Sequence, residues 1–170
     1  MKIFIYGVPG SGKTYYSKLL GTKLNLPVIE ADRIKKEHRS GKSKKLYPCL
    51  YLGTCQAYKK FGDLTSDNTI KGLFAVRKAL DNVIKNKIKK QSDLILEGAF
   101  LDPKSLKEFG KVMLLVTKDE KLHKKQFLHH REKILDLKGN EFKAARLVQE
   151  YLIQEAKEFS IEVVENTVPL

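Results

Sequence analysis

The stretch IFIYGVPGSGKTYYSKLL, residues 3–20, combines a strand signal, a turn signal and a helix signal. A short apolar run leads into the glycine-rich turn GVPGSGKT at residues 7–14, and a helix-like segment follows. The turn matches the pattern GxxxxGK[ST] in full and lies between a predicted strand and a predicted helix, which is the context that this pattern requires. The sequence therefore predicts a phosphate-binding loop.

The backbone of such a loop explains its chemistry. Glycines let the chain curl so that successive N–H groups point inward, and the following helix adds the positive end of its dipole. Lys13 is expected to place its charge on the β- and γ-phosphates, and the Thr14 hydroxyl to ligate Mg²⁺. The expected cofactors are ATP and Mg²⁺. The predicted nucleotide-binding residues of the loop are Pro9, Gly10, Ser11, Gly12, Lys13 and Thr14.

Length and composition predict a single globular domain over residues 1–170. The chain has 170 residues, of which 42% are hydrophobic and 31% charged, and these values are typical of a folded domain. The amino-terminal apolar run is too short for a secretory signal, and no stretch approaches the length of a membrane span. We therefore expect a cytoplasmic protein without a membrane partner. Cys49 and Cys55 lack metal-ligand spacing, which favours two reduced thiols in or near a core.

Strand-like and helix-like segments alternate along the chain, which predicts parallel strands with helices on both faces. The predicted strands are residues 2–6, 27–31, 93–98, 111–116 and 161–165. The predicted helices are residues 14–24, a segment after Asp32, residues 48–62, a long segment after 65–68, residues 119–132 and residues 142–158. The expected class is α/β, a three-layer P-loop fold of the kinase type with about five strands. A short helical lid is expected at about 119–142, with a loop at 135–141.

The formal net charge of +13 is the unusual bulk property. Lysines are spread over residues 33–45, 85–90 and 121–125, so the charge is compatible with several partners. These are a nucleic acid, an anionic membrane surface or a phosphorylated substrate, and the plain alternative is a solvated lysine-rich surface.

The pattern favours a small kinase among the proteins that use such a loop. A GTPase should carry an Asn/Thr-Lys-x-Asp segment, and TKDE at residues 117–120 has the wrong order. The chain is also short for a motor core, whereas a small kinase with a lid fits its length.

Two acidic residues follow or end predicted strands, where ligands bind in open α/β sheets. Asp32, at the end of the second strand, is predicted to bind the acceptor and to orient or deprotonate its hydroxyl; the alternative is a helix N-cap. Glu97 is predicted to hold Mg²⁺ through water and to border the substrate; the alternative is a satisfied carboxylate at a strand end.

Arginines are candidates for phosphate contacts, since the guanidinium fork suits phosphate geometry. Arg33 and Arg39 follow the second strand and are predicted to bind the acceptor. Arg131, beside the predicted lid loop, is a predicted catalytic residue together with Lys13 and Asp32. Arg146, in the helix after the lid, is predicted to contact the nucleotide. The alternative for each of these four arginines is a surface position outside the site.

Beyond the loop, five segments carry a resemblance to one family. They are EADRIKKEHR (30–39), GTCQAY (53–58), ILEGAFLDP (95–103), VTKDEKLHKKQF (116–127) and FKAARLVQEYLIQEAKEFSIEVVEN (142–166). Together they resemble the corresponding segments of 2-phosphoglycerate kinase, an archaeal P-loop kinase family that makes 2,3-bisphosphoglycerate from ATP and 2-phosphoglycerate. The resemblance implies a small anionic phosphorylated acceptor.

The departures from that family lie in its acceptor-side segments. They are Phe100 in place of histidine, Gln126 in place of arginine, and Thr54 and Cys55 in place of paired serines. Loss of an imidazole and a guanidinium would weaken stabilisation of a highly charged product unless Lys124, Lys125 or Arg131 substitutes. The resemblance thus supports a kinase more strongly than it supports one particular acceptor.

Three hypotheses follow. The first is an ATP-dependent kinase that phosphorylates a hydroxyl of a small anionic acceptor, with 2-phosphoglycerate as the preferred substrate. The second is a nucleic-acid 5′-hydroxyl kinase or a nucleoside kinase, for which steep salt dependence and base-stacking aromatics are expected. The third is a non-catalytic ATP-binding module. The preference between ATP and GTP and the oligomeric state are left open by the sequence.

Overall fold

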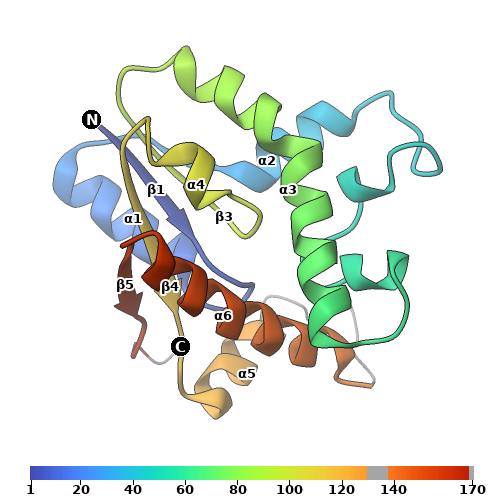
Figure 1. The fold of residues 1–170 in the computed structure, drawn as a ribbon. Helices are drawn as coiled ribbons and strands as arrows, with labels where there is room; N and C mark the ends of the chain where they lie inside the picture. The colour runs from blue at the N-terminus through green and yellow to red at the C-terminus, as the bar shows by residue number, and fades with distance from the viewer. Residues whose placement is uncertain (130–137, 169–170) are drawn as a thin grey trace.

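The computed structural model describes residues 1–129 and 138–168, and its centre is a five-stranded parallel sheet (Figure 1). The strands are β1 (Lys2–Tyr6), β2 (Val28–Glu30), β3 (Leu94–Gly98), β4 (Lys111–Val116) and β5 (Glu162–Glu165). Their order is β2-β3-β1-β4-β5, and all four pairings are parallel. The α/β class and the predicted strands are confirmed.

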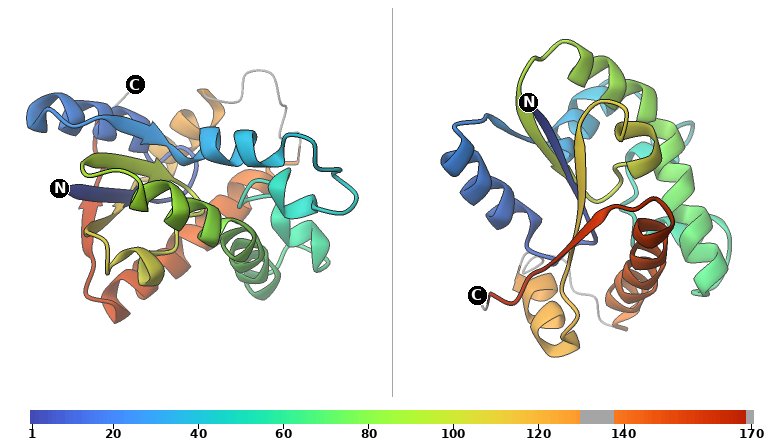
Figure 2. Two further views of the ribbon diagram at one scale, coloured as in Figure 1. Left: turned by 90° about the horizontal axis from the view of Figure 1, so that it is seen from above. Right: turned by 60° about the vertical axis from the view of Figure 1, so that its left-hand side comes forward.

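Helices cover both faces of this sheet, as predicted. The helices are α1 (Lys13–Leu24), α2 (Ala31–Arg39), α3 (Ser66–Lys89), α4 (Pro103–Leu106), α5 (Glu120–His129) and α6 (Asn140–Glu158). Figure 2 shows α1 on one side of the sheet and α3 and α6 on the other. Alternation along β1 explains the two layers, since Ile3 and Ile5 join the smaller apolar cluster under α1 whereas Phe4 and Tyr6 join the larger one.

The apolar side chains of α1 are only partly buried. Leu19 is 58% exposed and Leu24 is 38% exposed, although Tyr16 and Leu20 do pack against the smaller cluster. The fully buried positions are instead Lys13, Ser17 and Gly21. Small residues face the sheet because the helix starts directly from the loop at the end of β1 and lies close to it.

Other boundaries also differ from the sequence prediction. Residues 48–62 form two short 3₁₀ helices, η1 (Pro48–Leu50) and η2 (Ala57–Lys60), instead of one helix, because proline starts the first and Gly53 lies in the turn between them. Helix α4 was not predicted. Helix α6 begins at Asn140, inside the predicted loop. Residues 130–137, which include the first three residues of the loop predicted at 135–141, lie outside the described residues.

A buried ion pair joins α3 to α6 within the larger cluster. The Arg77 guanidinium donates through Nη1 and Nη2 to the two carboxylate oxygens of Glu155, at 2.6 and 2.9 Å, and the Tyr151 hydroxyl donates to Glu155 Oε1 at 3.2 Å. Burial, assisted by Glu155, raises the pKa of Tyr151 to about 12. Among the described residues, no helix combines the length and the apolar composition needed to cross a bilayer.

We predict that Arg77→Met destabilises the fold by about 3–5 kcal/mol, because it leaves the Glu155 carboxylate buried without its partner. The exposed pair Lys111–Glu162 provides the control, and Lys111→Met should cost less than about 1 kcal/mol. Urea unfolding of the two variants measures the difference. Equal losses would show that the buried pair contributes no more than a surface pair.

Candidate active site

The loop GVPGSGKT connects β1 to α1 at the carboxyl edge of the sheet. Gly10 and Gly12 have φ values of 81° and 85°, in the left-handed region that side chains other than glycine rarely adopt. A side chain at Gly10 would also collide with the backbone of Phe127, at 2.8 Å from its nitrogen and Cα. Helix α5 therefore packs directly against the outside of the loop.

Lys13 is buried inside this loop. Its side chain is 8% exposed, and the Nζ group donates a hydrogen bond to the Val8 carbonyl at 2.8 Å. Burial lowers the pKa of Lys13, and the nearby carboxylates of Glu97 and Asp32 oppose that shift. An ammonium has three N–H donors, and the bond to Val8 uses one of them. Lys13 can therefore still donate to an anion at the mouth of the loop.

Thr14 and Glu97, the predicted Mg²⁺ ligands, are in contact. The Thr14 hydroxyl donates to Glu97 Oε1 at 2.8 Å, and Glu97 is buried at the end of β3. The strand register explains the contact between Glu97 and Thr14, because Glu97 pairs with Ile5 of β1, the strand that leads into the loop. Burial raises the pKa of Glu97, whereas the Lys13 ammonium and the Thr14 hydroxyl lower it.

The residues present fit a polyphosphate with Mg²⁺. The Ser11 hydroxyl is buried in the loop and has no hydrogen-bond partner among residues 1–129 and 138–168, so a donor is available inside the cradle. Thr14 and Glu97 supply the oxygen ligands that Mg²⁺ prefers. No group of three His, Cys, Asp or Glu side chains in the described part of the chain forms a separate metal site.

Asp32 lies in the first turn of α2 and is exposed. The preceding strand ends at Glu30, so Asp32 follows the strand end by two residues; Glu30 occupies the N-cap position, so the N-cap alternative for Asp32 is wrong. Burial lowers the pKa of two lysines, Lys13 and Lys35, and the Asp32 carboxylate opposes that shift at both. Asp32 therefore acts electrostatically on both lysines.

Lys35 was not predicted from the sequence as a site residue. It is 6% exposed, its Nζ donates to the Leu52 carbonyl at 2.5 Å, and it lies 5.3 Å from the centroid of the Phe100 ring. Burial lowers its pKa. The available signal was its spacing of three residues from Asp32, which places both side chains on one face of a helix.

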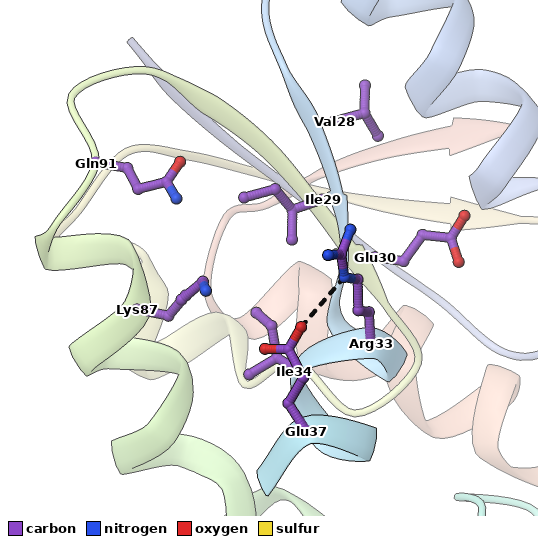
Figure 3. Close-up of a pocket in the computed structure, with 8 residues that line it drawn as sticks. All are labelled: Val28, Ile29, Glu30, Arg33, Ile34, Glu37, Lys87 and Gln91. Atoms are coloured by element: carbon purple, nitrogen blue, oxygen red, sulfur yellow. Dashed lines mark hydrogen bonds and ion pairs between the residues drawn. The ribbon is translucent and has the colours of Figure 1, made fainter.

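The predicted acceptor residues Arg33 and Arg39 do not contact the loop. Arg33 is 79% exposed in its side chain and pairs with Glu37, Nε to Oε1, at 3.2 Å. Figure 3 shows this pair beside a pocket of about 390 Å³ that opens along β2 and that no loop residue lines. The Arg39 guanidinium lies 5.2 Å from the Tyr51 ring centroid. Their acceptor role stays a prediction.

Arg146 reaches the loop through His123. Its Nη1 donates to the Thr117 carbonyl at 3.0 Å and lies 3.3 Å from His123 Nδ1, while its Nη2 donates to the Lys118 carbonyl at 3.1 Å. His123 Nε2 is 2.9 Å from the Pro9 carbonyl, which can only accept, so that nitrogen carries the proton. His123 was missed as a site residue. Arg131 lies outside the described residues.

Gln126, the departure from arginine, is buried beneath the carboxyl-terminal segment. Its Oε1 accepts from the Thr117 hydroxyl and from Asn166 Nδ2, both at 3.3 Å, and its Nε2 donates to the Val168 carbonyl at 2.9 Å. In this arrangement Gln126 anchors α5 to the last segment of the chain.

Sequence comparison finds similarity to curated 2-phosphoglycerate kinases. The protein of Methanocaldococcus jannaschii is 29% identical over 179 residues, and that of Pyrococcus horikoshii is 26% identical over 187 residues. Each alignment covers 96% of this chain but 58% of the relative, so the chain spans somewhat more than half the length of these relatives. No protein-family profile matches the sequence.

Structure comparison finds the same architecture in kinases of low sequence identity. Shikimate kinase from Acinetobacter baumannii in complex with shikimate aligns with a TM-score of 0.62 and 17% identity, covering 98% of this chain and 84% of that one. Deoxyadenosine kinase from M. mycoides aligns with a TM-score of 0.53 and 15% identity, covering 98% and 90%. The fold is that of the P-loop kinases.

The sequence relatives point to one family among the kinases that share this fold. The resemblance to 2-phosphoglycerate kinases, first indicated by the five segments, is confirmed over nearly the whole chain.

We predict that acid destabilises this protein partly through His123. Burial lowers the pKa of His123, so below about pH 6.5 the unfolded chain binds a proton that the folded chain does not. Stability from this group is therefore complete above that pH and falls as the pH drops from about 7 to 5, by up to about 1.4 kcal/mol per unit.

Urea unfolding of wild type and His123→Gln at several pH values measures this effect. The variant should lose less stability between pH 7 and 5 than wild type does. Lys124→Gln, at an exposed position of the same helix, should keep the wild-type slope. Parallel curves for wild type and His123→Gln would contradict the prediction.

Proposed function

We propose that this protein is an ATP-dependent kinase that phosphorylates a hydroxyl group of a small anionic acceptor, with 2-phosphoglycerate as the best candidate. The supporting observation is the buried Lys13 within the loop, set beside the contact between Thr14 and Glu97 and within the field of Asp32. These groups are the parts that phosphoryl transfer needs: a cation for the phosphates, ligands for Mg²⁺ and a carboxylate for the acceptor.

Each side chain has a distinct role in this proposal. Bound ATP supplies the phosphoryl group, and Mg²⁺ held by Thr14 and Glu97 supplies charge neutralisation. The loop N–H groups and the Lys13 ammonium hold the phosphates and stabilise the negative charge of the transition state. Asp32 orients the acceptor hydroxyl and takes its proton.

The acceptor is inferred from the relatives and from the local charge. The curated relatives are named 2-phosphoglycerate kinases, and a basic chain with two buried lysines beside Asp32 suits an anionic acceptor. The nucleic-acid hypothesis has less support. Of the three tyrosines near the lysine-rich segment, Tyr58 is buried and Arg39 lies over the Tyr51 ring, so Tyr47, which is 48% exposed, is the one left open for stacking.

A transfer assay with labelled ATP tests the function. The acceptors are 2- and 3-phosphoglycerate, nucleosides and 5′-hydroxyl oligonucleotides. We expect transfer to 2-phosphoglycerate, and Lys13→Ala should reduce it at least about 100-fold because one preorganised charge is lost. Lys18→Ala, on the exposed side of α1, should retain wild-type activity. Transfer to oligonucleotides alone would replace this proposal with the nucleic-acid kinase.

Asp32→Asn tests the role of the carboxylate. If Asp32 accepts the hydroxyl proton, kcat should fall about 100-fold or more, while the KM for ATP changes less than about three-fold. Steady-state kinetics at a saturating concentration of acceptor measures kcat and the KM for ATP separately. A loss shared equally between kcat and ATP affinity would make Asp32 a structural residue of α2.

A further inference from the structure

Two lysines are buried in the described part of the chain, and the Asp32 carboxylate acts electrostatically on both. Lys13 is 8% exposed and Lys35 is 6% exposed. Each donates one hydrogen bond to a backbone carbonyl, Val8 for Lys13 and Leu52 for Lys35. Among the described residues, neither ammonium lies within ion-pair distance of a carboxylate. Such burial without a counter-ion is costly unless a ligand completes it.

The position of Lys35 relates it to the acceptor and not to the nucleotide. It is three residues from Asp32 on α2, so the two side chains share a face of that helix. Its ammonium lies over the Phe100 ring, three residues beyond Glu97 at the end of β3. Lys35 is thus at the carboxyl edge of the sheet, where ligands of open α/β folds bind, and separate from the loop that holds Lys13.

The surroundings of Lys35 suit a ligand more than a structural cap. The Lys35 ammonium has three N–H donors, and within residues 1–129 and 138–168 its hydrogen-bond acceptor is Leu52 O. The remaining donors are available to an anion. Phe100 is 3% exposed and supplies an apolar wall that excludes water and strengthens any charge–charge contact there. A lysine that served only the Leu52 carbonyl would not need this second, charge-recognising contact with the ring.

We propose that Lys35 binds the anionic group of the acceptor, so that the site selects small hydroxy compounds carrying a carboxylate or phosphate. Lys35 then holds the acceptor and Lys13 the nucleotide, and Asp32 acts electrostatically on both lysines. The inference rests on the proposed kinase function for the identity of the ligand. Phe100, which replaces the family's histidine, becomes the wall against which this cation is placed.

Binding and kinetics of Lys35→Met test the proposal, with Lys36→Met, an exposed neighbour on α2, as the matched control. Calorimetric titration uses 2-phosphoglycerate, D-glycerate and glycerol 2-phosphate. Lys35→Met should weaken binding of 2-phosphoglycerate and raise its KM by about 10- to 100-fold, as expected for a lost hydrogen bond to a charged group. The KM for ATP should change less than about two-fold, and Lys36→Met should behave as wild type.

The three probes identify the group that Lys35 recognises. A Lys35-dependent affinity for glycerol 2-phosphate assigns a phosphate, and one for D-glycerate assigns a carboxylate. In wild-type protein labelled at the lysine ε-carbon, the Lys35 NMR signal should move on titration with the binding probe. This measurement needs no destabilising variant, and Lys35→Arg provides the assignment.

The outcomes distinguish this inference from the proposed function. If wild type phosphorylates 2-phosphoglycerate and Lys35→Met has the KM of Lys36→Met, the inference is wrong and the kinase stands. If binding depends on Lys35 but no probe is phosphorylated, the inference stands and the kinase assignment fails. A Lys35 signal that moves with none of the three probes, or a lower melting temperature with unchanged KM, would assign Lys35 to capping Leu52 alone.

Discussion

The ammonium group of Lys13, buried where β1 passes into α1, is the constraint around which the site is arranged. A buried cation without an ion pair is costly, and one hydrogen bond to Val8 O compensates for only part of its lost hydration. The field of Glu97 and Asp32 offsets a further part. Because neither carboxylate forms an ion pair with Lys13 among the described residues, the loop remains complementary to an added anion, and polyphosphate is the anion that its N–H groups and glycine geometry suit.

The register of the parallel strands places the other residues of the site near Lys13. β1 lies between β3 and β4, so residues far apart in sequence end at the same edge of the sheet. Glu97 reaches Thr14 because it pairs with Ile5, and His123 of α5 reaches Pro9 because α5 follows β4 directly. The loop is consequently held from two sides, and its shape depends on the packing of α5 as much as on its own glycines.

The proposed acceptor side has a different construction from the phosphate-binding loop. The nucleotide loop is continuous in sequence, whereas the surroundings of Lys35 come from α2, the segment around Leu52 and the turn that holds Phe100. Discontinuous sites of this kind change one residue at a time while the fold is retained. In this chain the loop matches its motif in full, whereas the segments that contain Thr54, Cys55 and Phe100 depart from those of similar kinases.

The sequence by itself determined the parallel α/β class, the loop with Lys13 and Thr14, and the choice of Thr14 and Glu97 as candidate Mg²⁺ ligands, because these follow from contiguous patterns and from strand ends that must share one edge. It did not reveal the burial of Lys35, the contact of His123 with Pro9, or the exposure of Arg33. Only the tertiary structure decided these features, because the sequence around a helical lysine or arginine does not show whether its side chain faces solvent or packs against a distant strand. Local patterns report backbone preferences, and burial is set by packing between segments far apart in the chain.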